Sequence, residues 1–153
     1  MPLPIFLGGG ILLLDQLSKL LIASTLPLHS LREVIPGLFN LVHVRNPGAA
    51  FSILAGADAA WRQGLFVGLT LFVLAIILFA YGKVPQSDRW TRTAYSLITG
   101  GALGNLIDRV RMGEVIDFLD FYIGSAHWPA FNVADSAISA GAIMLVISLF
   151  KGK

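Results

Sequence analysis

Long apolar stretches, separated by shorter polar segments, dominate the chain. The clearest of them runs from Gly64 to Gly82, 19 residues without a charged side chain. About 20 apolar residues in a helix are enough to cross the hydrocarbon core of a bilayer. Three other stretches are similar in length, although charged residues interrupt the first and lie at the ends of the third. The pattern therefore predicts four transmembrane helices, at about 5–26, 63–82, 92–111 and 134–150.

Two segments between the predicted helices do not continue them. Within residues 27–61, three prolines exclude one continuous helix. Residues 38–45, LFNLVHVR, are rich in branched and aromatic side chains and predict a short strand. Residues 112–133 form the second segment, which we also expect outside the membrane. The expected fold class is an all-α membrane protein: four transmembrane helices with a small extramembrane platform that contains β-structure.

The composition agrees with a membrane protein. Of the 153 residues, 56% are hydrophobic and only 13% are charged, whereas soluble domains carry about 25% charged residues. Four spans leave no room for a second domain, so we expect one integral-membrane domain over residues 1–153. The chain has no cysteine, which excludes disulfides, thiolate nucleophiles and cysteine-based metal sites. A net charge of +2 is too small to suggest a nucleic-acid partner.

The basic residues predict the orientation of the chain in the membrane. Four spans place both termini and the 83–92 turn on one side. The cations of that side are Lys83, Arg89, Arg92, Lys151 and Lys153. The positive-inside rule therefore predicts cytoplasmic termini, although Arg109 and Arg111 lie at the opposite end of the third helix. All three tryptophans fall near predicted span ends, as in an interfacial aromatic belt.

Two aspartates in apolar surroundings stand out within residues 113–136. Asp117 lies in the second extramembrane segment, and Asp135 lies at the start of the last helix. Burying a carboxylate among apolar side chains costs free energy, so such a residue usually has a pairing partner or a functional role. Two carboxylates held close together share a proton, so that one takes a proton from water while the other polarises a carbonyl. The pattern therefore predicts an aspartic hydrolase with Asp117 and Asp135 as the catalytic pair.

Other polar residues of the predicted helices fall at the same depth, near the outer surface. Asp15 and Lys19 are four residues apart and can pair on one helical face. Asn105, Asp108 and Arg109 share a face at the end of the third helix. We interpret both groups as support for the catalytic pair, and Asp15 with Lys19 can also be a purely structural ion pair.

Several alternative interpretations remain open from the residues alone. Asp135 can be only the N-cap of its helix, and Asp117 and Asp120 can be surface loop carboxylates. A triad of Ser136, His127 and an aspartate lacks a Gly-x-Ser-x-Gly elbow. A metal site built on His127 lacks a His-Glu-x-x-His motif. A proton or ion transporter would need carboxylates distributed along a path across the bilayer.

Five short motifs occur in order along the chain. They are DQLSK at 15–19, NPGAAF at 46–51, GGALGNLIDR at 100–109, VIDF at 115–118 and FNVAD at 131–135. With these motifs on a four-span chain of this length, the sequence resembles the bacterial lipoprotein signal peptidases (signal peptidase II). The resemblance extends from the first of these motifs to the last, and the ordered set is far more specific than any single motif.

The resemblance implies a membrane aspartyl endopeptidase of the bacterial inner membrane. Such an enzyme removes the signal peptide from diacylglyceryl-modified prolipoproteins and cleaves before the lipidated cysteine, with two aspartates activating a water. It implies Asp117 and Asp135 as catalytic residues, with no cofactor and no metal. The substrate-binding or supporting positions that it implies are Asp15, Lys19, Asn46, Gly48, Asn105, Asp108, Arg109 and Asn132.

The resemblance also implies further structure and partners. A β-cradle and a helical flap correspond to residues 27–61, and the active site faces the periplasm. The expected partners are diacylglyceryl prolipoproteins, membrane lipid and the cyclic peptide inhibitor globomycin, and the chain is expected to be a monomer.

Overall fold

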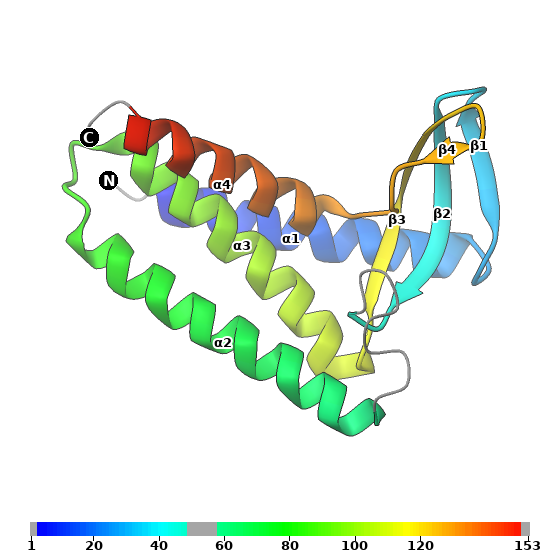
Figure 1. Cartoon of the computed structure of the whole chain (residues 1–153), viewed down its shortest axis with the longest axis horizontal. Helices are drawn as coiled ribbons and strands as arrows, with labels where there is room; N and C mark the ends of the chain where they lie inside the picture. The colour runs from blue at the N-terminus through cyan, green and yellow to red at the C-terminus, as the bar shows by residue number, and fades with distance from the viewer. Residues whose placement is uncertain (1–2, 49–57, 151–153) are drawn as a thin grey trace.

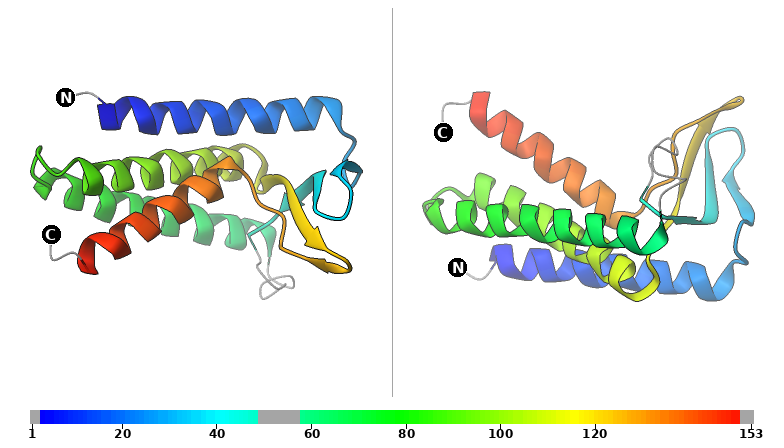
Figure 2. Two further views of the ribbon diagram at one scale, coloured as in Figure 1. Left: turned by 90° about the horizontal axis from the view of Figure 1, so that it is seen from above. Right: turned by 60° about the horizontal axis from the view of Figure 1, so that its bottom comes forward.

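Four helices form a bundle in the structure, a computed structural model that describes residues 3–48 and 58–150. Their bounds are α1 Leu3–Thr25, α2 Ala59–Lys83, α3 Arg89–Met112 and α4 Val133–Phe150. Each agrees with a predicted span to within a few residues. The first turns of α1, the last turns of α4 and the α2–α3 turn lie at one end of the bundle (Figures 1 and 2).

Three of the helices, α1, α2 and α4, are long and apolar enough to cross a membrane. Their surfaces expose large apolar side chains such as Leu17, Phe72 and Leu149, which suits contact with lipid rather than water. The charged residues at both ends of α3 lower its mean hydropathy. A fourth span along α3 therefore stays a prediction.

The helix α3 lies at the centre of the bundle. It packs against each of the other three helices, whereas α2 contacts neither α1 nor α4 within the described residues. Small residues permit this packing. A side chain at Gly100 would meet the backbone of Gly8 in α1, and one at Gly101 would meet the backbone of Ala134 in α4. Backbones that approach so closely are typical of membrane helices.

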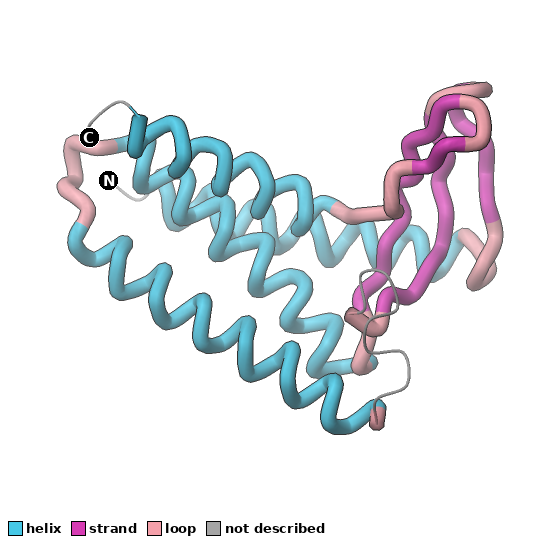
Figure 3. The backbone as a smooth tube through the Cα atoms, in the orientation of Figure 1, coloured by secondary structure: helices cyan, strands magenta, loops and turns pink. Residues whose placement is uncertain are grey.

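An antiparallel sheet of four strands covers the other end of the bundle (Figure 3). The strands are β1 Leu31–Ile35, β2 Phe39–Asn46, β3 Val115–Ile123 and β4 Ala126–His127, in the spatial order β1-β2-β3-β4. The strand predicted at 38–45 is confirmed as β2. Of the segment 27–61, in which the flap is predicted, residues 49–57 lie outside the described residues.

The strand β3 joins the sheet to the helices and was not predicted as a strand. Its first four residues are all buried, so it lacks the alternation of apolar and polar residues that marks a half-exposed strand. Ile116 and Phe118 pack against Ile22 of α1. These contacts fix Asp117, which lies between them in sequence, beside the ends of α1 and α3.

Candidate active site

Buried polar side chains gather where the sheet meets the helices. They come from α1, α3, β3 and the segment that leads into α4. The buried members are Asp15, Lys19, Asn105, Asp108, Asp117 and Asn132. Burying polar groups is tolerated when they bond to one another, and each of these side chains has such a partner.

The Lys19 ammonium lies at the centre of this cluster. It is 2.8 Å from Asp15 Oδ2 and 2.8 Å from Asp108 Oδ2, and it donates to Asn105 Oδ1 at 2.9 Å. A lysine ammonium has three N–H donors and no acceptor, so three partners use its whole capacity. The predicted pairing of Asp15 with Lys19 is confirmed, and Asp108 joins it as a second buried carboxylate.

The two carboxylates around Lys19 receive further donors. The Gln16 side chain donates to Asp108 Oδ1 at 3.0 Å and to Asp15 Oδ2 at 3.3 Å. The backbone N–H of Ala134 donates to Asp15 Oδ1 at 2.9 Å. A Cβ at Gly104 would strike the Asp15 carboxylate, so only glycine fits there. Gln16 was not singled out in the sequence, although it directly follows Asp15.

Lys19 fixes the orientation of the Asn105 side chain. Because the lysine can only donate, the oxygen of the Asn105 amide faces it and the NH₂ group faces away. That NH₂ group donates to Asp135 Oδ1 at 2.8 Å. Lys19 on α1 therefore orients Asn105 on α3 so that its NH₂ group donates to Asp135 on α4.

Asn132 bridges the two candidate catalytic aspartates. Its Oδ1 accepts from the Asp135 N–H at 2.9 Å, and its Nδ2 donates to Asp117 Oδ1 at 2.7 Å. The Asn132 N–H donates in turn to Asp135 Oδ2 at 3.3 Å. This reciprocal arrangement is a capping box at the start of α4. Asn132 is therefore the N-cap, and the interpretation of Asp135 as the N-cap is wrong.

The Asp117 carboxyl has two amide donors, Asn132 and Asn46, the latter at 3.1 Å from Oδ2. Burial in the protein raises the pKa of Asp117 to about 6, and the neighbouring Asp135 carboxylate acts in the same direction. Hydrogen bonds from the two asparagines and the charge of Lys19 oppose the shift without cancelling it. Asp117 thus holds a proton far more readily than an ordinary aspartate.

Asn46 and Gly48 form the turn at the end of β2. The Gly48 N–H donates to Asn46 Oδ1 at 2.9 Å, which leaves the Asn46 NH₂ group for Asp117. Gly48 has a φ of +95°, and a Cβ there would strike the Phe66 ring of α2. Both the backbone conformation and the space therefore require glycine.

The Arg109 guanidinium lies against α2. Its Cζ is 5.2 Å from the centre of the Phe66 ring. Its Nε is buried and has no hydrogen-bond partner among the described residues. The partners of Asp108 are Lys19, Gln16 and the Ile116 N–H, so Arg109 does not hold Asp108. The guanidinium instead lies at the edge of a cavity between α2, α3 and α4.

Asp120 is not the surface loop carboxylate that the sequence suggested. It is buried in β3, where Asn40 donates to Oδ2 at 2.8 Å and His127 lies 2.9 Å from Oδ1. Burial favours a higher pKa for Asp120, but the hydrogen bonds from Asn40 and His127 prevail and lower it. Ser136 donates to the Asn132 carbonyl oxygen. Since Ser136 and His127 bond to different partners, their geometry does not favour a serine triad.

The comparisons with known proteins give the family. The family described as "Signal peptidase (SPase) II" matches residues 8–151. The chain belongs to this family. A lipoprotein signal peptidase of Syntrophus aciditrophicus is 49% identical over 152 residues, which cover 98% of this chain and 94% of that protein. One of Geobacter metallireducens is 47% identical over 140 residues, covering 92% and 85%.

Solved structures show the same fold as this member of the signal peptidase II family. A "Bacterial membrane enzyme structure" at 1.9 Å resolution has a TM-score of 0.88 and 36% identity, covering 100% of this chain and 96% of that chain. A second, at 2.3 Å, has a TM-score of 0.87 and 37% identity, covering 99% and 89%. Membership of this family shows that the chain is a peptidase. The family and the apolar helices together show that it is a bacterial membrane protein.

Proposed function

We propose that this chain is an aspartyl endopeptidase that removes the signal peptide from diacylglyceryl-modified prolipoproteins, cleaving before the lipidated cysteine. The observation that carries the proposal is the pair of carboxyls on either side of Asn132. One of them, Asp117, is kept near its protonated form by burial, and the other, Asp135, accepts from Asn105 and from the N-terminus of α4. One protonated and one ionised carboxyl are what water activation needs.

The proposed reaction uses a single water between the two aspartates. Asp135 removes a proton from the water while the water oxygen attacks the scissile carbonyl carbon. Asp117 gives its proton to the carbonyl oxygen as negative charge develops there. In the second step Asp135 gives its proton to the amide nitrogen, the C–N bond breaks, and the carbonyl re-forms as Asp117 recovers its proton. No covalent intermediate is needed.

The substrate is proposed to enter sideways from the bilayer. A cavity of about 210 Å³ lies between α2, α3 and α4, with apolar walls that include Leu69, Val73 and Ile138. Asn105 and Arg109 form its polar end. An apolar segment of the signal peptide would lie along these walls, and the half-buried Arg109 guanidinium would donate a hydrogen bond to a carbonyl oxygen of the substrate. Acyl chains would stay in lipid or between helices.

The proposal extends to topology and partners. With α3 as the fourth span, both termini lie in the cytoplasm and the sheet and the aspartates lie at the periplasmic face of the inner membrane. The enzyme acts as a monomer without cofactor or metal. Globomycin is expected to inhibit it by occupying the site around Asp117 and Asp135.

A matched pair of substrates tests this function. The purified chain should cleave a prolipoprotein whose lipobox cysteine carries diacylglycerol, and it should leave the same precursor uncut when that cysteine is not lipidated. Mass spectrometry of the products should place the new N-terminus at the lipidated cysteine. Equal cleavage of both precursors would contradict the proposed specificity, and cleavage elsewhere would contradict the proposed site.

The raised pKa of Asp117 predicts a pH dependence with a definite sign. Asp117 must keep its proton, and it loses that proton as the pH rises through about 6. We expect kcat/KM, which reports the free enzyme, to fall about tenfold per pH unit above that value. Asp120→Asn serves as the control, because this carboxylate lies among Asn40 and His127 and its loss should leave the descending limb in place. A flat profile from pH 5 to 8 would exclude Asp117 as the proton carrier.

A further inference from the structure

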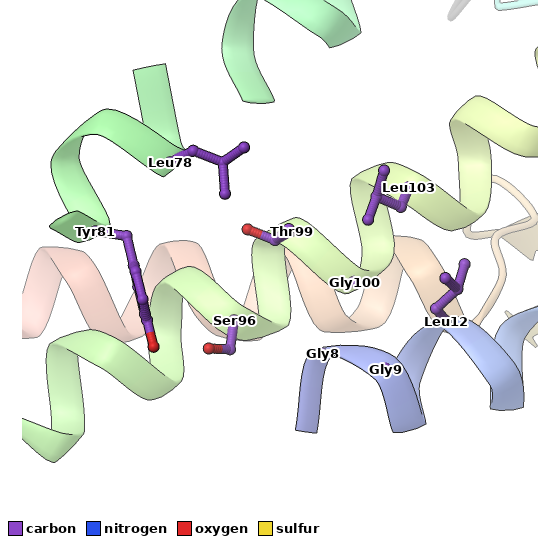
Figure 4. Close-up of a pocket in the computed structure, with 9 residues that line it drawn as sticks. All are labelled: Gly8, Gly9, Leu12, Leu78, Tyr81, Ser96, Thr99, Gly100 and Leu103. Carbon is purple, nitrogen blue, oxygen red and sulfur yellow. The ribbon is translucent and has the colours of Figure 1, made fainter. Parts of the chain in front are cut away.

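A second cavity lies on the opposite side of α2 from the proposed substrate path. Its volume is about 340 Å³, and it is bounded by α1, α2 and α3 in the half of the bundle that carries the termini. Figure 4 labels the residues that line it, with Leu78 on α2, Leu12 on α1 and the lining residues of α3 between them in this view. The cavity exists because α1 and α2 both pack on α3 without contacting each other within the described residues.

The walls of this cavity present hydrocarbon. They consist mainly of leucine and glycine, with Thr99 adding one hydroxyl, and the hydroxyls of Ser96 and Tyr81 already have partners in Arg92. Ser96 donates to the Arg92 carbonyl oxygen at 2.8 Å, and Tyr81 accepts from Arg92 Nη2 at 2.7 Å. An apolar gap between two helices that face a bilayer is filled by hydrocarbon rather than by water. The occupant that suits the walls is therefore an acyl chain.

The rim of the cavity is positively charged. The Arg92 guanidinium lies 4.2 Å from the centre of the Tyr81 ring, and Tyr81 lines the cavity. Hydrogen bonds to Tyr81 and to the Val84 carbonyl oxygen use two of the five N–H donors of Arg92. Lys83, two residues after Tyr81, is exposed at the same end of α2, with its ammonium 4.2 Å from the centre of the Phe79 ring. Cations at this end of the bundle, near the expected membrane surface, attract the phosphate of an anionic lipid.

We propose that this cavity is a binding site for one anionic phospholipid of the leaflet at the termini. One acyl chain lies between α1 and α2, and the phosphate lies against Arg92, with Lys83 adding to the positive charge at the same end of α2. The bound lipid connects α2, which otherwise packs only on α3 among the described helices, to α1. The site is separate from the aspartates, so the proposal does not depend on the proposed peptidase mechanism.

Two neighbouring glycines of α1 provide a matched test. Gly9 lines the cavity and Gly10 does not, yet an added Cβ meets nothing within 4 Å at either position. Both replacements by phenylalanine should therefore fold, and both gain similar helix propensity. Only Gly9→Phe fills the cavity. Wild type and Gly10→Phe should retain one phosphatidylglycerol in native mass spectrometry, whereas Gly9→Phe should bind it at least about tenfold more weakly.

The headgroup is tested with phosphatidylcholine and with Lys83→Gln. Phosphatidylglycerol should raise the unfolding temperature of the delipidated wild type in neutral detergent more than phosphatidylcholine does, and Lys83→Gln should reduce that difference. Equal binding of phosphatidylglycerol by the two glycine variants would overturn the site. Equal responses to the two lipids would overturn its preference for an anionic headgroup. The lipid comparison uses the unaltered chain and so needs no variant to fold.

Discussion

Replacing either Asp117 or Asp135 by asparagine should lower the rate of prolipoprotein cleavage by about 10²–10⁴-fold. An asparagine at position 135 has no carboxylate to take the proton from water. An asparagine at position 117 has no proton to offer to the carbonyl oxygen. Because each group performs a different half of one step, losing one should cost nearly as much as losing both.

The measurement is single-turnover cleavage of a diacylglyceryl prolipoprotein in detergent or in a reconstituted bilayer. Asp120→Asn is the matched control, since it changes the same residue type three positions along β3 and should keep most of the activity. Circular dichroism and the unfolding temperature should show that both variants of the pair remain folded. Substantial cleavage by Asp117→Asn or Asp135→Asn would show that the two aspartates do not act as a catalytic pair.

Lys19→Ala should cost about 3–5 kcal/mol of folding free energy. The lysine is buried and holds the carboxylates of Asp15 and Asp108 at 2.8 Å each. Without it, two buried carboxylates face each other with only neutral donors around them. Adding Asp108→Asn to Lys19→Ala removes one of those charges, and we expect it to recover part of the loss.

Thermal unfolding in detergent measures this effect, with Arg111→Ala as the control for losing an exposed cation of α3. Preparations of Lys19→Ala that stay folded should keep partial activity, because Asn105 can still donate to Asp135 although its orientation is no longer imposed. A Lys19→Ala variant as stable as wild type but inert would assign Lys19 a direct part in the chemistry instead.

The sequence by itself determined the helices, β2 and the pairing of Asp15 with Lys19. These features depend on neighbours along the chain, such as runs of apolar residues, a branched and aromatic segment, or two charges one helical turn apart. The ordered motifs pointed to the family, which the comparisons confirm. They also marked the residues that the structure brings together around Lys19 and Asn132.

The tertiary structure alone decided which partner each buried polar group takes. Lys19 reaches Asp108 and Asn105, 89 and 86 residues away by number, because α1 and α3 approach at their glycines. Asp120 is buried because β3 pairs with β2, a contact that no local pattern encodes.

The same holds for the protonation of the aspartates. In the local sequence, Asp117 and Asp135 both lie beside apolar residues, and nothing there distinguishes the free-energy cost of burying one charge from that of burying the other. Burial by other segments raises the pKa of Asp117, and its hydrogen-bond donors also come from other segments, Asn132 from the start of α4 and Asn46 from β2. Sequence patterns report that a charge must be compensated, but the free energy of each protonation state depends on distances that only the packed chain sets.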